Sequence, residues 1–296
     1  MTERHRVFTT LGAFWLLASP GAASAQDSTF HSGTVTIRYV DRGAGEPVVL
    51  IHGYSGSVER HWVTTGVLDS LMKDHRVIAL DLRGHGKSDK PHDPAEYGPQ
   101  MAQDVVRLLD HLEIRRAHLV GYSLGAALVT QLVASNPDRV ETATLVAGAG
   151  YHSWSSRDED VNERAAAELE GPVPFRSLIV TLTPSGEPTP SDDDIRAKSR
   201  ALEAVNDVHA LAALTRNRRG LVSSIDRIVA AQVPMLGVVG SADGALGSIR
   251  QLQSAVPTLS VVIVDGASHG GDRSVLKRPE FLTALRSFLD KHHDAH

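Results

Sequence analysis

The chain has 296 residues, of which 42% are hydrophobic and 22% charged, a balance typical of globular proteins. Its formal net charge is −5 with no long run of one sign, so the sequence lacks the basic face typical of nucleic-acid binding. It contains no cysteine, which excludes disulfides, a cysteine nucleophile and a zinc–thiolate site.

Residues 1–25 have the features of a secretory signal peptide. Two arginines near the start precede a short apolar stretch at 11–18, and Ala23-Ser24-Ala25 fits the small-residue cleavage rule. The stretch is shorter than the about 20 residues that cross a bilayer, which disfavours an uncleaved anchor. We therefore expect export to the periplasm or the exterior, and a mature protein that begins at Gln26 and has no membrane span.

Short apolar runs alternate with helical patterns along the first half of the chain. A continuous apolar run bounded by turn residues is typical of a buried parallel strand, and apolar residues spaced three and four apart indicate a helix. These patterns predict strands at 34–40, 47–51, 76–80, 117–120 and 142–147, and helices at 101–112 and 126–134.

The alternation breaks at residue 151 and resumes near residue 232. The intervening segment, 151–231, has two helical stretches around a proline-rich turn and predicts an inserted helical cap. The remainder predicts strands at 234–240 and 259–264, and helices at 249–255 and 279–289. We expect an α/β fold, in which residues 26–150 and 232–296 form a mostly parallel central sheet flanked by helices.

The segment Gly121-Tyr122-Ser123-Leu124-Gly125 joins a predicted strand to a predicted helix. A sharp strand-to-helix turn strains the serine backbone and leaves no room for larger neighbours, which explains both glycines. It also lifts the serine hydroxyl to a helix N-terminus, where amide groups meet developing negative charge. A glycine-rich turn with a helix-capping serine is the alternative, but the strand–turn–helix context favours Ser123 as a nucleophile.

A serine nucleophile needs a base that takes its proton and an acid that orients the base. Among 15 histidines we favour His269, which lies in a glycine-flanked loop after the last predicted strand. Asp243 directly follows the strand at 234–240, and the chain order Ser, Asp, His is the one expected for a triad on such a fold. Asp265 and Asp272 are rivals because they are close to His269 in sequence.

A tetrahedral oxyanion needs preorganised hydrogen-bond donors. The backbone N–H of Leu124, directly after the nucleophile, is one candidate. The second is the backbone N–H of Tyr54, in the turn after the strand at 47–51. We interpret the neighbouring His52 as a turn residue packed under the site.

Taken together, these segments resemble the α/β-hydrolase family. The resemblance rests on the His52-Gly53 turn, Asp81-x-Arg83-Gly84-His85-Gly86-x-Ser88, the Ser123 elbow, Gly240-x-x-Asp243 and the His269 loop. It implies a cap at 151–231 and a structural role for Arg83 and His85 in a loop beside the oxyanion turn. Haloalkane dehalogenases and epoxide hydrolases of this family have an aspartate at the elbow, which Ser123 argues against.

On these residues we expect a secreted serine hydrolase that cleaves a small carboxylic ester through an acyl-enzyme, with no metal and no organic cofactor. Lactones, thioesters, amides and carbon–carbon bonds are cleaved by the same groups, and a perhydrolase role also stays open. A non-catalytic ligand-binding protein on this fold is the alternative of another class. The basic segment 217–219 of the cap is more typical of a solvated patch than of an anion site.

Overall fold

The computed structural model of the protein describes residues 27–293, and an eight-stranded sheet lies at its centre in the order β1-β2-β4-β3-β5-β6-β7-β8. The first two strands run antiparallel to their neighbours, and all pairs from β4 to β8 are parallel. The strands are β1 Ser28–Ser32, β2 Val35–Arg42, β3 Pro47–Ile51, β4 Arg76–Leu80, β5 Ala117–Tyr122, β6 Val140–Val146, β7 Met235–Gly240 and β8 Leu259–Val264.

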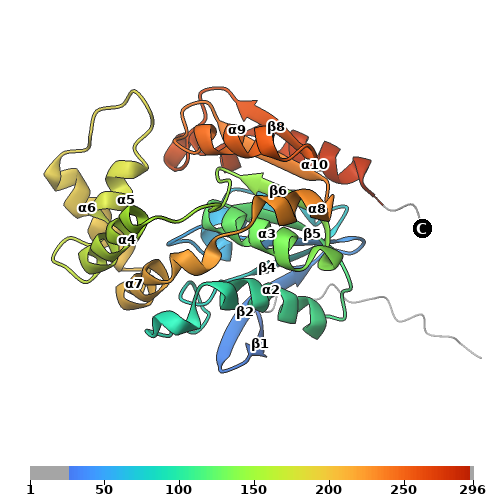
Figure 1. Cartoon of the computed structure of the whole chain (residues 1–296), viewed down its shortest axis with the longest axis horizontal. Helices are drawn as coiled ribbons and strands as arrows, with labels where there is room; N and C mark the ends of the chain where they lie inside the picture. Colours follow the sequence, from blue (N-terminus) through green and yellow to red (C-terminus); the bar gives the residue numbers. More distant parts are fainter. Residues whose placement is uncertain (1–26, 294–296) are drawn as a thin grey trace, which may run out of the picture.

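Helices cover both faces of this sheet (Figure 1). Successive side chains of a strand point to opposite faces, so Val49 and Ile51 of β3 pack in one apolar cluster while Val48 and Leu50 pack in the other. The first cluster lies under α2 (Pro99–His111), α3 (Leu124–Ser135), α8 (Ile225–Ala231) and α9 (Leu246–Ala255), and the second under α1 (Val67–Leu71) and α10 (Pro279–Lys291). Burial of both faces explains why the parallel strands are continuous apolar runs.

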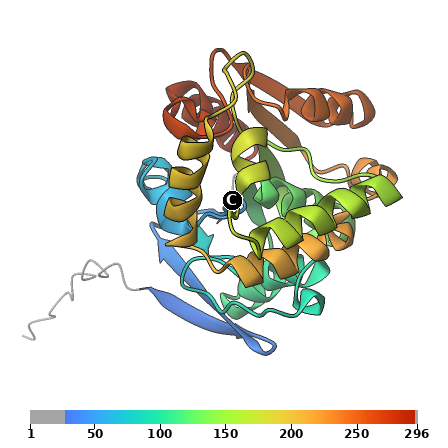
Figure 2. The ribbon, with the colours of Figure 1, turned by 90° about the vertical axis from the view of Figure 1, so that its left-hand side faces the viewer.

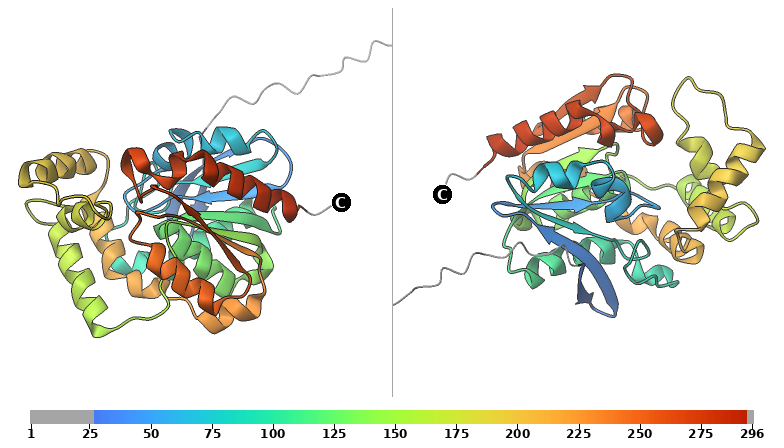
Figure 3. Two further views of the ribbon diagram at one scale, coloured as in Figure 1. Left: turned by 90° about the horizontal axis from the view of Figure 1, so that it is seen from above. Right: turned by 180° about the vertical axis from the view of Figure 1, so that it is seen from behind.

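Four helices stand apart from the sheet and lie within the segment predicted to be a cap: α4 (Ser156–Leu169), α5 (Arg176–Thr181), α6 (Asp192–Glu203) and α7 (Val208–Arg216). Figures 1, 2 and 3 show them together beyond one end of the sheet. They have an apolar cluster of their own, which includes Phe175, Ile195 and Leu211. The predicted cap boundary at residue 231 stays a prediction. Helix α8, the last element before this boundary, packs against α3 and places Ile228 in the main core.

The predicted α/β fold is confirmed, and the strands and helices predicted for the core lie within a few residues of their observed bounds. Strand β1 and helices α1, α5, α7 and α8 have no counterpart in the predictions. The predicted signal peptide, residues 1–25, lies outside the described residues, so its cleavage and the expected export stay predictions. Within residues 27–293, every helix is too short or too polar to cross a membrane.

Candidate active site

Ser123 lies at the sharp turn between β5 and α3, with the backbone angles φ 55° and ψ −110°. Such angles cost a non-glycine residue about 1–3 kcal/mol and persist only where packing enforces them. A Cβ on Gly121 would lie 2.2 Å from the Gly125 carbonyl oxygen, and one on Gly125 would lie 2.0 Å from that of Ile51. Both glycines are therefore required by close backbone packing, as the sequence predicts.

His269 bridges the two other residues of the predicted triad. Its Nε2 atom lies 3.0 Å from Ser123 Oγ, and its Nδ1 atom lies 3.1 and 3.2 Å from the two carboxylate oxygens of Asp243. The Asp243 side chain is 1% exposed, whereas that of His269 is 15% exposed. The loops after β5, β7 and β8 thus meet at the carboxyl edge of the sheet, where active sites of such folds form.

The loops that carry Asp243 and His269 are joined to each other. The Ala242 N–H donates to the Ala267 carbonyl oxygen at 2.9 Å. A Cβ on Gly240 would lie 2.1 Å from that same oxygen, so glycine is required for this approach. The Ala245 N–H also donates to Asp243 Oδ1 at 2.8 Å and holds the carboxylate toward the imidazole.

The two rival carboxylates have other partners. Asp265 accepts a hydrogen bond from the Ser241 hydroxyl at 3.1 Å and is exposed. Asp272 pairs with Lys277 at 3.4 Å and is fully exposed. Of the three candidate acids, only Asp243 has a hydrogen bond to His269 in the part of the chain that the structure describes.

The segments that carry the two predicted oxyanion donors both adjoin Ser123. Leu124 is the first residue of α3, so its N–H has no acceptor within the helix. The turn that carries Tyr54 abuts the serine, because a Cβ on Gly53 would lie 3.1 Å from Ser123 Cβ. The Tyr54 side chain points to the cap, where its hydroxyl bonds the Leu211 carbonyl oxygen at 3.3 Å and the Thr215 hydroxyl at 3.0 Å.

His61 belongs to this site but was not predicted. It lies in a single turn of π-helix, Glu59–Val63, lines the cavity with Ser123, and its Nδ1 accepts the Gly53 N–H at 3.2 Å. Acceptance at Nδ1 puts the proton of a neutral imidazole on Nε2, and burial lowers its pKa well below the ordinary value. No local pattern marks this histidine, because its contact with Gly53 exists only in the folded turn.

Tyr122 directly precedes Ser123 in the elbow and lines the same cavity. Its hydroxyl donates to the His269 carbonyl oxygen, and its ring contacts the rings of both His61 and His269. Burial raises the pKa of this phenol, which keeps it a donor. Tyr122 therefore ties the nucleophile turn to the loop of the proposed base.

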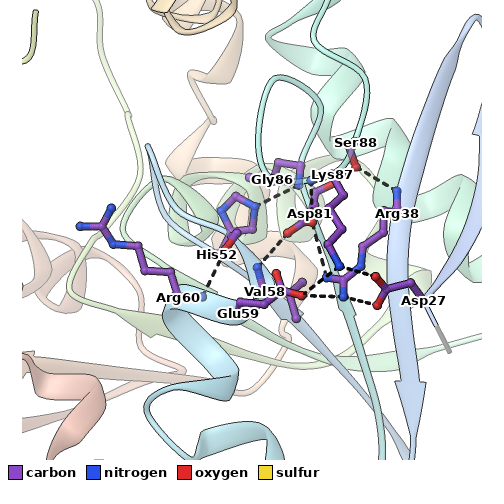
Figure 4. A network of polar contacts seen from close by, with 12 residues as sticks. Asp27, Arg38, His52, Val58, Glu59, Arg60, Asp81, Gly86, Lys87 and Ser88 are labelled. Atoms are coloured by element: carbon purple, nitrogen blue, oxygen red, sulfur yellow. Dashed lines mark hydrogen bonds and ion pairs between the residues drawn. The ribbon is translucent and has the colours of Figure 1, made fainter. Parts of the chain in front are cut away.

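A buried polar network supports the turn beside the site (Figure 4). Asp81 follows β4, and its carboxylate accepts the N–H groups of Val58 at 2.8 Å and Lys87 at 2.9 Å. Arg38 contacts Asp81 at 3.4 Å and Glu59 at 2.7 Å. These contacts fix the start of the π-helix and so the position of His61.

His52, Arg83 and His85 occupy positions that fit the structural role expected of them. His52 is fully buried, with Nδ1 donating to the Gly53 carbonyl oxygen at 2.8 Å and Nε2 accepting the Leu82 N–H at 3.0 Å. Arg83 forms a two-pronged ion pair with Asp104, at 2.6 and 2.7 Å. His85 Nδ1 bonds the Arg83 carbonyl oxygen, and its buried Nε2 has no protein partner within the described range.

We expect the buried histidines to make the fold acid-sensitive. Burial lowers the pKa of His52 to about 4 and that of His85 to about 3, whereas an unfolded histidine titrates near about 6.5. Between these values the unfolded chain binds more protons than the folded chain, so stability falls as pH decreases below about 6.5. Urea unfolding at pH 7, 6 and 5 should give decreasing midpoints.

His85→Gln tests the contribution of a buried histidine to this acid sensitivity. His31→Gln, at an exposed position, is its control. The first should reduce the slope of unfolding free energy against pH, whatever its stability at pH 7, since one proton fewer is taken up on unfolding. The second should leave that slope unchanged. An unaltered slope in His85→Gln would refute this origin of the acid sensitivity.

A cavity of about 330 Å³ opens beside Ser123 and His269. The core supplies the β3 turn, the π-helix and the loop after β8, and the cap supplies Leu178 and Leu182. Arg218 of the basic segment 217–219 does not line this cavity. Its guanidinium lies over the Tyr54 ring, 4.8 Å from the ring centre. The cavity has the size of a small-molecule site.

Comparison with known proteins finds the same architecture in other proteins. Residues 46–171 match the family model of the alpha/beta hydrolase fold. A solved thermophilic esterase from Thermogutta terrifontis, with malate bound, has a TM-score of 0.75 at 23% identity, over 91% of this chain and all of that one.

Two curated relatives differ in how much they share with the chain. Esterase YbfF of Escherichia coli is 40% identical over 36% of this chain and 41% of its own length. A putative 2-succinyl-6-hydroxy-2,4-cyclohexadiene-1-carboxylate synthase of Bacillus subtilis is 28% identical over 79% of this chain and 88% of its own. The chain spans only 36% and 30% of the lengths of two further curated relatives. The family match over residues 46–171 and the similarity to the solved esterase show that the chain has the alpha/beta hydrolase fold.

Proposed function

We propose that the protein is a serine hydrolase that cleaves a small carboxylic ester, with Ser123 as nucleophile, His269 as general base and acid, and Asp243 as the orienting carboxylate. One observation carries this proposal: the His269 imidazole lies within hydrogen-bond distance of both Ser123 Oγ and the Asp243 carboxylate. A nucleophile, a base and an orienting acid in one hydrogen-bonded line are the parts that acyl transfer requires.

The contacts favour a definite protonation state at the start of the reaction. A carboxylate only accepts, so His269 carries its proton on Nδ1, and its Nε2 is free to accept the Ser123 proton. Ser123 Oγ then attacks the ester carbonyl carbon while Nε2 takes the proton. Asp243 stabilises the imidazolium that forms.

The negative charge that develops on the carbonyl oxygen would be met by the N–H groups of Leu124 and Tyr54. The position of Leu124 at the start of α3 and the contact of Gly53 with Ser123 support this assignment. His269 next protonates the leaving alcohol, and the acyl group stays on Ser123. Water repeats the sequence and releases the acid.

The similarity to esterase YbfF supports an ester as the substrate. Thioesters, lactones, amides and carbon–carbon bonds would be attacked by the same groups, so they are the alternatives that a substrate panel separates. Leu178 of α5 and Leu182, which directly follows this helix, line the cavity and support a role of residues 151–231 as a cap that limits substrate size. The signal-peptide features of residues 1–25 support export, which detection of a protein starting at Gln26 outside the cytoplasm would test.

The test is hydrolysis of 4-nitrophenyl esters from acetate to octanoate by the purified protein. We expect the highest kcat/KM for a short acyl chain, because the cavity measures only about 330 Å³. A fluorophosphonate probe should label the protein once, and mass spectrometry of peptides should find the adduct on Ser123. Absence of both hydrolysis and labelling would contradict the proposal and favour a binding role.

A further inference from the structure

In the described part of the chain, the cavity beside Ser123 is lined by basic side chains and by no acidic ones. Arg60 and Lys277 line it, and its lining within the described residues contains no aspartate or glutamate. The net charge of the whole chain is −5, so the basic lining of this cavity does not follow from the overall composition. Cations that line a concave site attract anionic ligands more strongly than cations on a flat surface.

Arg60 lines the cavity, and the carboxylate next to it in the chain is turned away from it. Its neighbour Glu59 turns to Arg38, at 2.7 Å, and the two side chains leave the π-helix in opposite directions (Figure 4). The Arg60 guanidinium has a long contact, 3.4 Å, with the Ser55 carbonyl oxygen. Its planar donor groups are thus largely available to a ligand, and guanidinium binds a carboxylate through paired hydrogen bonds.

Lys277 reaches the same cavity from the loop after β8. Its contact with Asp272, at 3.4 Å, is an exposed pair in which the carboxylate is fully solvated, and such pairs contribute little. Arg60 and Lys277 come from segments more than 200 positions apart in the chain. Both nevertheless line the cavity that contains Ser123 and His269.

We propose that the substrate carries an anionic group, such as a carboxylate, in addition to the bond that is cleaved, and that Arg60 and Lys277 bind this group. The inference rests on the proposed hydrolase function. Leu178 and Leu182 would contact the apolar part of the substrate between the two ends. The anion site is thus formed by the core rather than by the basic segment 217–219 of the cap.

The test compares monomethyl adipate, which carries one carboxylate, with dimethyl adipate, which is neutral and nearly identical in shape. Methanol release gives kcat/KM for each, and the readout is the ratio of the two values. The wild-type protein should prefer the monoanion by about tenfold, the order expected for one charge-assisted contact. This preference should decrease as salt is added, because screening weakens exposed charges.

Arg60→Gln and Lys277→Gln should each lower this ratio, while the exposed cap variant Arg200→Gln should keep it. A general loss of structure changes both esters alike and leaves the ratio intact. Equal or better cleavage of dimethyl adipate by the wild type would overturn the anion site and leave the hydrolase function standing.

Binding to the Ser123→Ala variant separates the two proposals, because it needs no turnover. Calorimetric titration with monomethyl adipate should give tighter binding than dimethyl adipate, and Arg60→Gln in the same background should remove the difference. If the wild type cleaves no ester yet this preference persists, the hydrolase function fails and the anion site stands. If binding shows no preference, the anion site fails.

Discussion

Ser123→Ala should lower kcat for 4-nitrophenyl ester hydrolysis by about 10⁶, the scale on which removal of a serine nucleophile acts. The variant keeps the Cβ atom and loses only the hydroxyl that attacks the carbonyl carbon. The Ser123 side chain forms no capping hydrogen bond with α3, so the fold should not depend on it. Circular dichroism and urea unfolding should match the wild type within about 1 kcal/mol.

Ser274→Ala is the matched control for this loss. Ser274 lines the same cavity, and its hydroxyl makes a long contact, 3.4 Å, with the His269 carbonyl oxygen. Its removal should cost at most about tenfold, since a weak hydrogen bond contributes about 1 kcal/mol. Activity of Ser123→Ala within tenfold of the wild type would remove Ser123 from its proposed role, because no other serine is held by His269 Nε2 in the described part of the chain.

The core of the fold was predictable because its signals are local. A parallel strand buried on both faces is a continuous apolar run, and β3, β5 and β7 are such runs. Ser123, Asp243 and His269 each lie within five residues after the end of a strand. Active groups gather at the carboxyl ends of parallel strands, so these three residues were predicted to lie close together. The alternation of strands with helices then implied one parallel sheet.

The parts that were missed lack a local signal. Strand β1 is mostly polar, with Phe30 and Ser32 buried, and it exists through pairing with β2. Helix α7 was missed although its residues Ala210 to Thr215 are buried, because periodicity alone does not reveal a helix covered on most sides. The meeting of Arg60 and Lys277 in one cavity depends on tertiary structure and leaves no trace in either segment.

Asp243→Asn should lower kcat by about 10⁴, the order seen when the orienting acid of such a triad loses its charge. The Ala245 N–H donates to Asp243 Oδ1, so in the variant we expect the amide oxygen at this position and the amide nitrogen beside His269 Nδ1. An amide nitrogen only donates, which favours the imidazole tautomer with its proton on Nε2. That atom then faces Ser123 Oγ as a donor and no longer accepts its proton.

Asp265→Asn and Asp272→Asn provide controls of identical chemistry at the two rival positions. Both carboxylates are exposed and have partners other than His269, so each variant should retain kcat within about threefold, as a change of exposed charge has little effect. If Asp265→Asn lowered kcat more than Asp243→Asn does, the orienting role would belong to Asp265 in the loop after β8. The contacts of His269 favour Asp243, because a buried carboxylate that also accepts a backbone N–H is held in place when the imidazole becomes charged.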